Sequence, residues 1–295
     1  MTKIWTLAAT LAAALCSVSA AAQPAQPSPP AFRVVPTTPS LRPAIELGGG
    51  TGAEQWEAFV DQVSVRNVTG AALYPVLPAK GRGNGQAIIV VPGGGYRFVS
   101  IESEGFRVAE ALAAEGYAAF VLKYRTTPTA RDIPAYLADT MQLFANLGKG
   151  ELADNPLAVD DLARAIGHVR AHAAEWQVDP ARVGVIGFSA GSRTAIRLLE
   201  TQAGVAGQLA TVALLYPPMT QPVKPGPRPP LFLAIASDDP LFRQGKLTLV
   251  DQWLNDSPQV EFHLYAGGSH GFGMRPTGHT SDLWIGQYIA WLKRH

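Results

Sequence analysis

The sequence Gly-Phe-Ser-Ala-Gly at residues 187–191 constrains the fold of this chain more than any other feature. It follows an apolar run, residues 183–186, and precedes a helix-like stretch, residues 193–200. This context predicts a strand, a tight turn and a helix, in which any side chain flanking the serine would collide with the neighbouring strand or helix. Such a turn is strained and holds the hydroxyl of Ser189 out at the top of a sheet.

A serine hydroxyl is a poor nucleophile at neutral pH and needs a base, usually histidine, to take its proton. Of the six histidines, His270 lies in a glycine-rich loop, residues 267–272, directly after a strand predicted at 260–265. His168 and His172 share a helix face at the spacing i, i+4, but no carboxylate completes a metalloprotease pattern with them. We therefore predict His270 as the base, a solvent-exposed face for the other two, and neither a metal nor a cofactor.

A carboxylate that orients the histidine should follow another strand, which is predicted at 231–236. Asp238 and Asp239 both stand there. Such an acid fixes the imidazole tautomer and stabilises the imidazolium that forms during the reaction. Either aspartate could instead cap the next helix, and we choose Asp239 because it directly precedes a proline. The order serine, acid, histidine is the one expected of α/β-hydrolases.

Negative charge that develops on a carbonyl oxygen needs backbone N–H donors. Ala190, directly after the serine, supplies one of them. The second is expected from Pro-Gly-Gly-Gly-Tyr at residues 92–96, from Gly94 or Gly95, because glycines let the main chain approach a substrate. Beside these two loops we expect three residues that contact the substrate: Tyr96, Ser192 and Arg193.

Apolar strands alternate with helical patterns along most of the chain. This alternation predicts an α/β fold with a mostly parallel central sheet and helices on both faces. The remaining strands are predicted at 87–91, 117–123 and 211–216, with a strand pair at 63–68 and 71–76. The helices are predicted at 102–115, 156–176, 241–254 and 281–293. We expect 124–154 to be rich in turns and to pack over a sheet edge or the mouth of the site. Seven prolines in 216–230 predict a loop beside the site.

The N-terminus is typical of an export signal. Lys3 precedes an apolar run, residues 4–15, and small residues follow, so we predict a signal peptide at 1–22 and export to the periplasm or medium. A flexible proline-rich leader is expected at 23–43 and the catalytic domain at 44–295. The apolar run is too short for stable membrane insertion. Cys16 is the only cysteine, which excludes disulfides from the mature chain.

The net charge of +1 offers nothing that attracts nucleic acid, and the sequence leaves the oligomeric state open. A chain of 295 residues with 47% apolar composition is long enough to bury a full core as one catalytic domain.

Five segments resemble secreted α/β-hydrolases of the acetyl-xylan-esterase and feruloyl-esterase-like group, which are often labelled endo-1,4-beta-xylanase. They are Val-Pro-Gly-Gly-Gly-Tyr at 91–96, Glu-Gly at 104–105, Ala-Phe-Val-Leu-Lys-Tyr-Arg at 119–125, Gly-Phe-Ser-Ala-Gly at 187–191, and Gly-Ser-His-Gly-Phe at 268–272. The resemblance implies the α/β-hydrolase fold and a serine esterase that acts on short acyl groups, commonly acetyl esters of plant polysaccharide. A glycosidase would instead need two carboxylates flanking a sugar bond.

The expected function is therefore hydrolysis of short acyl esters, of small molecules or polysaccharide, through an acyl-enzyme. Two alternatives remain open. A peptidase of the prolyl-oligopeptidase type has the same order of residues, but it usually carries a large N-terminal propeller for which this chain lacks the length. A non-catalytic binding protein on a hydrolase scaffold would not need Ser189, Asp239 and His270 intact.

Overall fold

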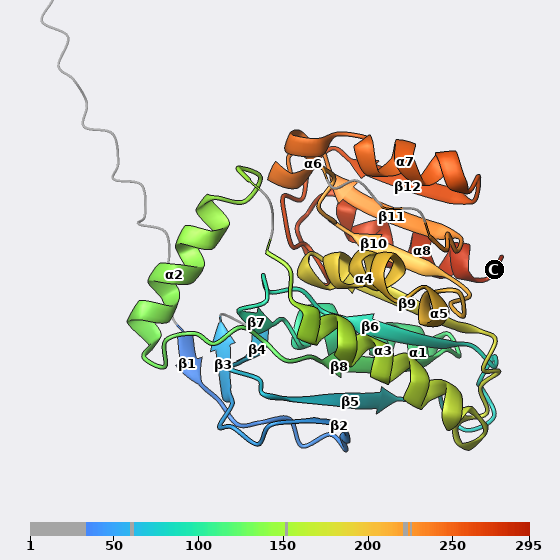
Figure 1. Ribbon diagram of the computed structural model, residues 1–295, viewed down its shortest axis with the longest axis horizontal. Coiled ribbons are helices and arrows are strands. Elements are labelled where there is room, and N and C mark those ends of the chain that lie inside the picture. Colours follow the sequence, from blue (N-terminus) through green and yellow to red (C-terminus); the bar gives the residue numbers. More distant parts are fainter. Residues whose placement is uncertain (1–33, 60–61, 151–152, 221–223, 225) are drawn as a thin grey trace, which may run out of the picture. The chain divides into compact units, whose positions relative to one another are not determined.

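The computed structural model describes residues 34–59, 62–150, 153–220, 224 and 226–295. Within these residues the chain forms an eight-stranded sheet covered by helices (Figure 1). Its strands lie in the order β12 (Val260–Tyr265), β11 (Leu231–Ala236), β10 (Val212–Leu215), β9 (Val183–Phe188), β6 (Ala87–Val91), β8 (Ala118–Lys123), β5 (Gly70–Val76) and β2 (Ile45–Gly49). The strands from β12 to β8 are parallel, whereas β5 and β2 continue one edge antiparallel. This confirms the predicted mostly parallel sheet.

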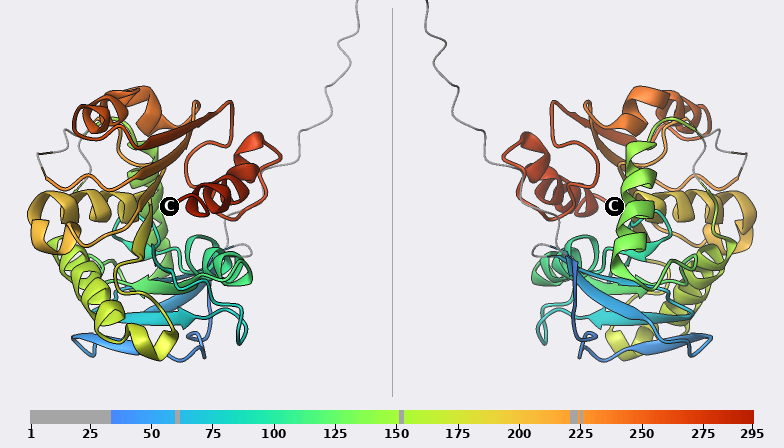
Figure 2. Two further views of the ribbon diagram at one scale, coloured as in Figure 1. Left: turned by 90° about the vertical axis from the view of Figure 1, so that its right-hand side faces the viewer. Right: turned by 90° about the vertical axis from the view of Figure 1, so that its left-hand side faces the viewer.

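The helices lie on both faces of the sheet, as the side views show (Figure 2). One face carries α1 (Arg107–Ala114) and α8 (Trp284–Leu292), and the other carries α3 (Pro156–Ala171), α4 (Ala190–Thr201) and the short α5 (Ala203–Ala206). Every residue of β6, β8, β9, β10 and β11 is buried, because helices cover both sides of these strands.

Two predicted helices are interrupted. The helix expected at 102–115 begins as a π-helical turn, η1 (Glu102–Phe106), and continues as α1. The one expected at 241–254 is divided into α6 (Pro240–Gly245) and α7 (Thr248–Asp256), because Lys246 between them has a positive φ of 51°. Short 3₁₀ turns, η2 (Ala173–Trp176) and η3 (Thr280–Leu283), lie next to α3 and α8.

A smaller antiparallel sheet corrects two predictions. Its strands are β1 (Val34–Pro36), β3 (Gln55–Phe59), β4 (Gln62–Arg66) and β7 (Phe98–Val99). The strands expected to pair near 63–68 and 71–76 belong to different sheets, because Asn67, with φ of 54°, redirects the chain between them. Residues 34–36 were placed in a flexible leader, but they pair with β3. The predicted signal peptide and the rest of that leader up to residue 33 lie outside the described residues.

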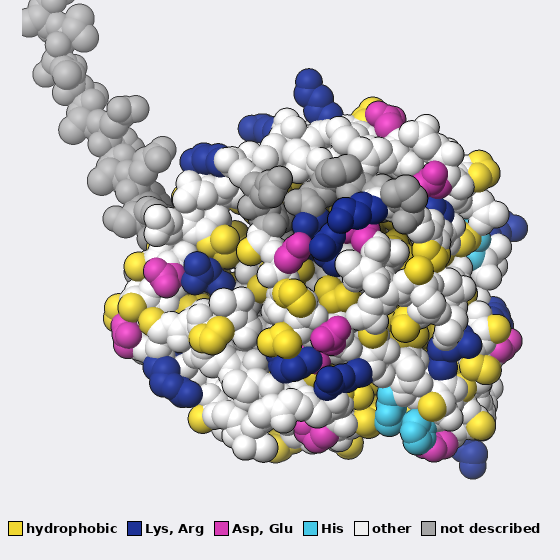
Figure 3. Space-filling view, viewed as in Figure 1, with side chains coloured by type: hydrophobic (Ala, Val, Ile, Leu, Met, Phe, Trp, Pro, Cys, Tyr) yellow, Lys and Arg dark blue, Asp and Glu magenta, His cyan; other side chains and the backbone are white. Residues whose placement is uncertain are grey.

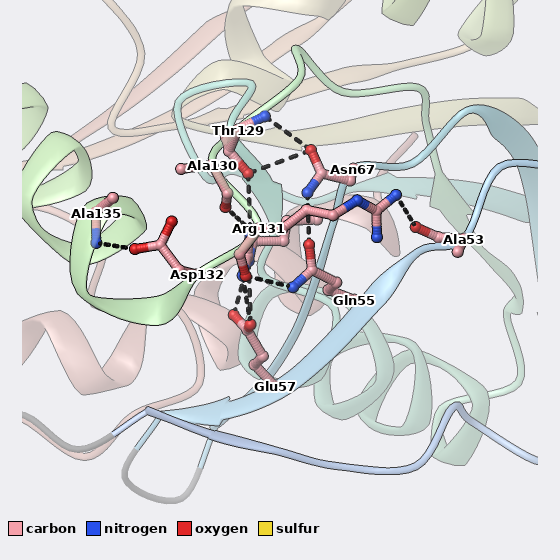
Figure 4. A network of polar contacts seen from close by, with 10 residues as sticks. Ala53, Gln55, Glu57, Asn67, Thr129, Ala130, Arg131, Asp132 and Ala135 are labelled. Carbon is pink, nitrogen blue, oxygen red and sulfur yellow. Dashed lines mark hydrogen bonds and ion pairs between the residues drawn. The ribbon is translucent and has the colours of Figure 1, made fainter.

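Segment 124–154, expected to be rich in turns, contains the helix α2 (Ile133–Ala145), which stands at the carboxyl ends of the parallel strands (Figure 1). A polar network fastens the start of α2 to the smaller sheet (Figure 4). Buried Arg66 pairs with Glu57 at 2.8 Å and donates to the carbonyl oxygen of Arg131, and Asp132 caps the N-terminus of α2. The segment is therefore anchored at this end.

The opposite end of the same segment packs against the start of α6. A β-carbon at Gly148 would stand 2.6 Å from the carbonyl oxygen of Pro240, and Gln244 donates to the carbonyl of Gly150. Residues 131–150 thus run from the smaller sheet to the start of α6, and we call them the covering segment. No helix in the described part of the chain has the length and apolar character needed to cross a membrane.

Candidate active site

Ser189 lies in the strand, turn and helix context that the sequence predicted. It follows β9 directly and is the residue before α4. Its φ of 50° and ψ of −110° are strained for a residue with a side chain, and its N–H donates to the carbonyl of Leu215 at 3.0 Å. A β-carbon at Gly187 would stand 2.5 Å from the carbonyl oxygen of Gly191, which explains the flanking glycines.

The structure brings Ser189, His270 and Asp239 together. Nε2 of His270 lies 2.8 Å from the Ser189 hydroxyl oxygen, and its Nδ1 lies 2.8 Å from Asp239 Oδ2. Asp239 is fully buried, whereas Ser189 is partly exposed. We assign Nδ1–H as the donor to Asp239, which leaves Nε2 to accept the serine proton. The three residues follow β9, β11 and β12, so they meet at the carboxyl edge of the sheet.

The two adjacent aspartates have separate contacts. Asp239 uses its second oxygen to accept the N–H of Leu241 at 2.8 Å, so one carboxylate both caps α6 and orients the histidine. Asp238 accepts the N–H of Ser269 at 2.9 Å and so holds the loop that carries the histidine. This geometry places Asp239, and not Asp238, against His270.

The other pair of histidines lies together on α3 and at its end. The rings of His168 and His172 stack with centroids 4.3 Å apart, and burial, followed by the neighbouring His172, lowers the pKa of His168. The described residues contain no group of three or more metal-ligating side chains.

The glycine loop after β6 offers free backbone donors close to Ser189. A β-carbon at Gly93 would stand 3.0 Å from the Ser189 β-carbon. The N–H of Gly93 donates to Glu104, whereas those of Gly94, Gly95 and Ala190 have no hydrogen-bond partner among the described residues. Gly94 and Gly95 have φ of 126° and 58°, which side chains rarely adopt.

The three residues predicted to contact substrate have different surroundings. Ser192 is fully buried, and its hydroxyl lies 2.7 and 2.9 Å from the carbonyl oxygens of Gly187 and Leu215. That prediction is wrong, because Ser192 is taken up in holding the turn. Tyr96 is buried with its hydroxyl 3.1 Å from that of Thr194.

Arg193 is buried and pairs with Asp154 at 2.8 Å. One terminal nitrogen of its guanidinium, Nη1, has no partner in the described part of the chain. Tyr96 and Arg193 therefore stay predictions as substrate contacts.

Three further residues border the site and received no role from the sequence, although Glu104 lies in one of the segments that carry the resemblance. Buried Glu104 contacts the glycine loop, and the ring of Tyr216 lies edge-on to His270 with centroids 5.0 Å apart. Leu143 of α2 packs on Gly95, where a β-carbon would stand 2.5 Å from its Cδ2. One signal was readable for Glu104, because it lies on the same helical stripe as the apolar residues Ile101 and Val108.

The sheet topology and the three-residue cluster at its carboxyl edge define an α/β-hydrolase. A family model described as the dienelactone hydrolase family matches residues 74–283. The chain belongs to this family. The predicted class, an α/β-hydrolase similar to acetyl-xylan esterases, is confirmed at this level.

Individual relatives fit the same class. The chain is 24% identical over 245 residues to an acetylxylan esterase of Xylanibacter ruminicola, over 71% of this chain and 46% of the relative. It therefore spans about half the length of that curated protein.

Solved structures show the shared fold. An acetyl ester-xyloside bifunctional hydrolase from Caldicellulosiruptor lactoaceticus matches with a TM-score of 0.56 at 23% identity, over 77% of this chain and 89% of that one. The carboxylesterase Cest-2923 of Lactobacillus plantarum matches with a TM-score of 0.57 at 17% identity, over 85% and 97%.

Proposed function

We propose that this protein is a serine carboxylesterase that hydrolyses short acyl esters, acetyl esters above all. The observation that carries the proposal is the chain of two 2.8 Å contacts from the Ser189 hydroxyl through His270 to the buried Asp239. The N–H groups of Ala190 and of Gly94 or Gly95 support it, because they have no hydrogen-bond partner within the described residues and can donate to an oxyanion.

The reaction follows from these positions. Ser189 Oγ attacks the ester carbonyl carbon while its proton passes to Nε2 of His270, and the N–H groups stabilise the oxyanion. The intermediate collapses with cleavage of the bond to the alcohol, which receives the proton from the imidazolium. Water then attacks the acyl-serine, gives a proton to His270, and the acid leaves as the proton returns to Ser189. Asp239 accepts the Nδ1–H bond throughout and stabilises the imidazolium.

The position of the covering segment favours substrates with a small acyl group. Leu143 packs on Gly95 beside the proposed oxyanion donors, where a long acyl chain would collide with it. Apolar side chains are spread over this face of the molecule (Figure 3), and those of Met141 and Phe144 in α2 are 56% and 44% exposed.

The names of the acetylxylan esterase and the acetyl ester-xyloside hydrolase favour acetylated plant polysaccharide, or its oligosaccharides, as the source of the ester. The predicted signal peptide at residues 1–22 would deliver the enzyme to such a substrate outside the cytoplasm.

The test compares wild type with Ser189→Ala on 4-nitrophenyl acetate, acetylated xylo-oligosaccharides and an aminoacyl anilide. Ser40→Ala, a serine remote from the site, is the matched control. We expect hydrolysis of the esters and not of the anilide, its loss in Ser189→Ala, and covalent labelling of wild type and control by a fluorophosphonate. Equal rates in wild type and Ser189→Ala would reject the proposal. Cleavage of the anilide alone would favour a peptidase, and an unlabelled wild type a binding protein.

A further inference from the structure

Glu104 is a buried carboxylate that takes part in no step of the proposed reaction. It lies in η1 and is 5% exposed. Its carboxylate forms no ion pair with a lysine or arginine in the described part of the chain. Burial raises the pKa of Glu104, against the effect of its hydrogen bonds and of nearby His270 and Arg275. Burial of a carboxylate is unfavourable unless hydrogen bonds compensate for the lost contact with water. The hydrogen bonds of Glu104 therefore indicate which parts of the site it holds.

The first hydrogen bond holds the loop of the proposed oxyanion donors. Glu104 Oε2 accepts the N–H of Gly93 at 2.7 Å, one residue before Gly94. A β-carbon at Gly93 would stand 2.8 Å from that oxygen, so the contact leaves no room for a side chain. This bond therefore helps to hold Gly94 and Gly95 beside Ser189, together with the N–H of Ser100, which donates to the carbonyl of Gly93 at 3.0 Å.

The second hydrogen bond reaches the neighbour of the proposed base. Glu104 Oε1 accepts the hydroxyl proton of Tyr216 at 2.7 Å, and the ring of Tyr216 lies edge-on to His270. Tyr216 is fully buried and held at a φ of 37°, which persists only where the surroundings enforce it. The loop after His270 also folds over Glu104, since a β-carbon at Gly273 would stand 3.0 Å from Glu104 Cγ.

We propose that Glu104 is a positioning residue that sets the distance between the oxyanion donors and the general base. One oxygen fixes the glycine loop and the other fixes Tyr216 against His270. The inference rests on the proposed ester hydrolysis, because it concerns the same site. It predicts a defect in turnover rather than in substrate binding, since the alignment matters most in the transition state.

The central test measures kcat and KM for 4-nitrophenyl acetate. Glu104→Ala should lower kcat by about 10²-fold and change KM less than about threefold, because a misplacement near 1 Å has this effect. Glu104→Gln, whose amide can still partner both groups, should restore kcat to within about fivefold of wild type. Glu102→Gln, in the same turn but with a partly exposed side chain paired to Arg107, is the matched control and should behave as wild type.

Tyr216→Phe keeps the ring beside His270 and removes the hydroxyl. It should lower kcat about tenfold in the wild-type background and have no further effect together with Glu104→Ala, because both changes break one bond. The double variant removes the Tyr216 hydroxyl together with the carboxylate that accepts its proton, so this hydroxyl is not left buried without a partner. It can therefore replace Glu104→Ala in the test if that single variant does not fold.

A wild-type kcat in Glu104→Ala, or in the double variant where the single one does not fold, overturns the inference. So does a kcat in Glu104→Gln as low as in Glu104→Ala, or full additivity with Tyr216→Phe. In each of these cases the wild type still hydrolyses the ester. If the wild type neither hydrolyses it nor takes a fluorophosphonate label, the proposed function itself fails.

Discussion

Replacing Gly191 by alanine should destabilise the fold and disable the site together. Gly191 is the second residue of α4 and lies against the end of β6. A β-carbon there would stand 2.7 Å from the carbonyl carbon of Val91 and closer still to its oxygen. Unbonded carbon atoms rest about 3.5–4.0 Å apart, so α4 has to withdraw from β6 by about 1 Å.

Both consequences have an expected size. Overpacking a core costs about 1–3 kcal/mol and occasionally more, and here the obstacle is backbone on both sides, so we expect a loss of about 3 kcal/mol or more. Ser189 moves with α4, and its 2.8 Å contact to His270 cannot survive a shift of about 1 Å, which predicts a loss of about 10²-fold in kcat.

Gly167→Ala is the matched control. Gly167 also lies in a helix, α3, but a β-carbon there meets nothing within 4 Å. It should gain about 0.5–1 kcal/mol, because alanine is the better helix former, and leave activity unchanged. Urea unfolding followed by tryptophan fluorescence and hydrolysis of 4-nitrophenyl acetate check both variants. If Gly191→Ala is as stable and active as Gly167→Ala, the close approach of α4 to β6 does not control this site.

Three further predictions concern single side chains. Asp239→Asn should lower kcat by up to about 10⁴-fold by favouring the wrong imidazole tautomer, and a loss below tenfold would contradict its proposed role. Leu143→Ala should raise the ratio of kcat/KM for butyrate over acetate aryl esters about tenfold, whereas an unchanged ratio would mean that the acyl chain points elsewhere. Because burial raises the pKa of Glu104, the folded chain binds that proton more tightly than the unfolded chain, and stability falls as pH rises from the unfolded pKa through the folded one. The unfolding midpoint of Glu104→Gln should therefore rise relative to wild type above about pH 4.3, and parallel midpoints from pH 4 to 8 would refute this.

Features that depend on local sterics or on strand order could be predicted from the sequence. The turn at Ser189 needs glycine two positions away on each side, and the loops after β11 and β12 supply an acid and a histidine in a fixed order. Helix α2 was missed because apolar residues also occupy its exposed positions, among them Met141 and Phe144, so they do not mark a single face. Its signals were local ones, the capping Asp132 and a proline in the first turn.

The partners of Glu104 were beyond sequence reasoning for a different reason. Gly93 is 11 residues away and Tyr216 is 112, and no spacing rule relates such positions. Ser192 shows the same limit from the other side. A polar residue three positions after the nucleophile is a reasonable candidate for a substrate contact. Its hydroxyl instead bonds the carbonyls of Gly187 and Leu215, and this depends on the pairing of β10 with β9, which the sequence does not reveal.

Backbone strain and buried hydrogen bonds occur together throughout this site. Tyr96, Ser189 and Tyr216 all have positive φ, and each such residue costs about 1–3 kcal/mol. Each is also held by a bond from another element: Tyr96 to Thr194, Ser189 to Leu215, and Tyr216 to Glu104. Because a strained conformation persists only while its surroundings enforce it, removing such a bond should release the site before the sheet unfolds. The strained residues are therefore where the chemistry is most sensitive to substitutions that never touch a substrate.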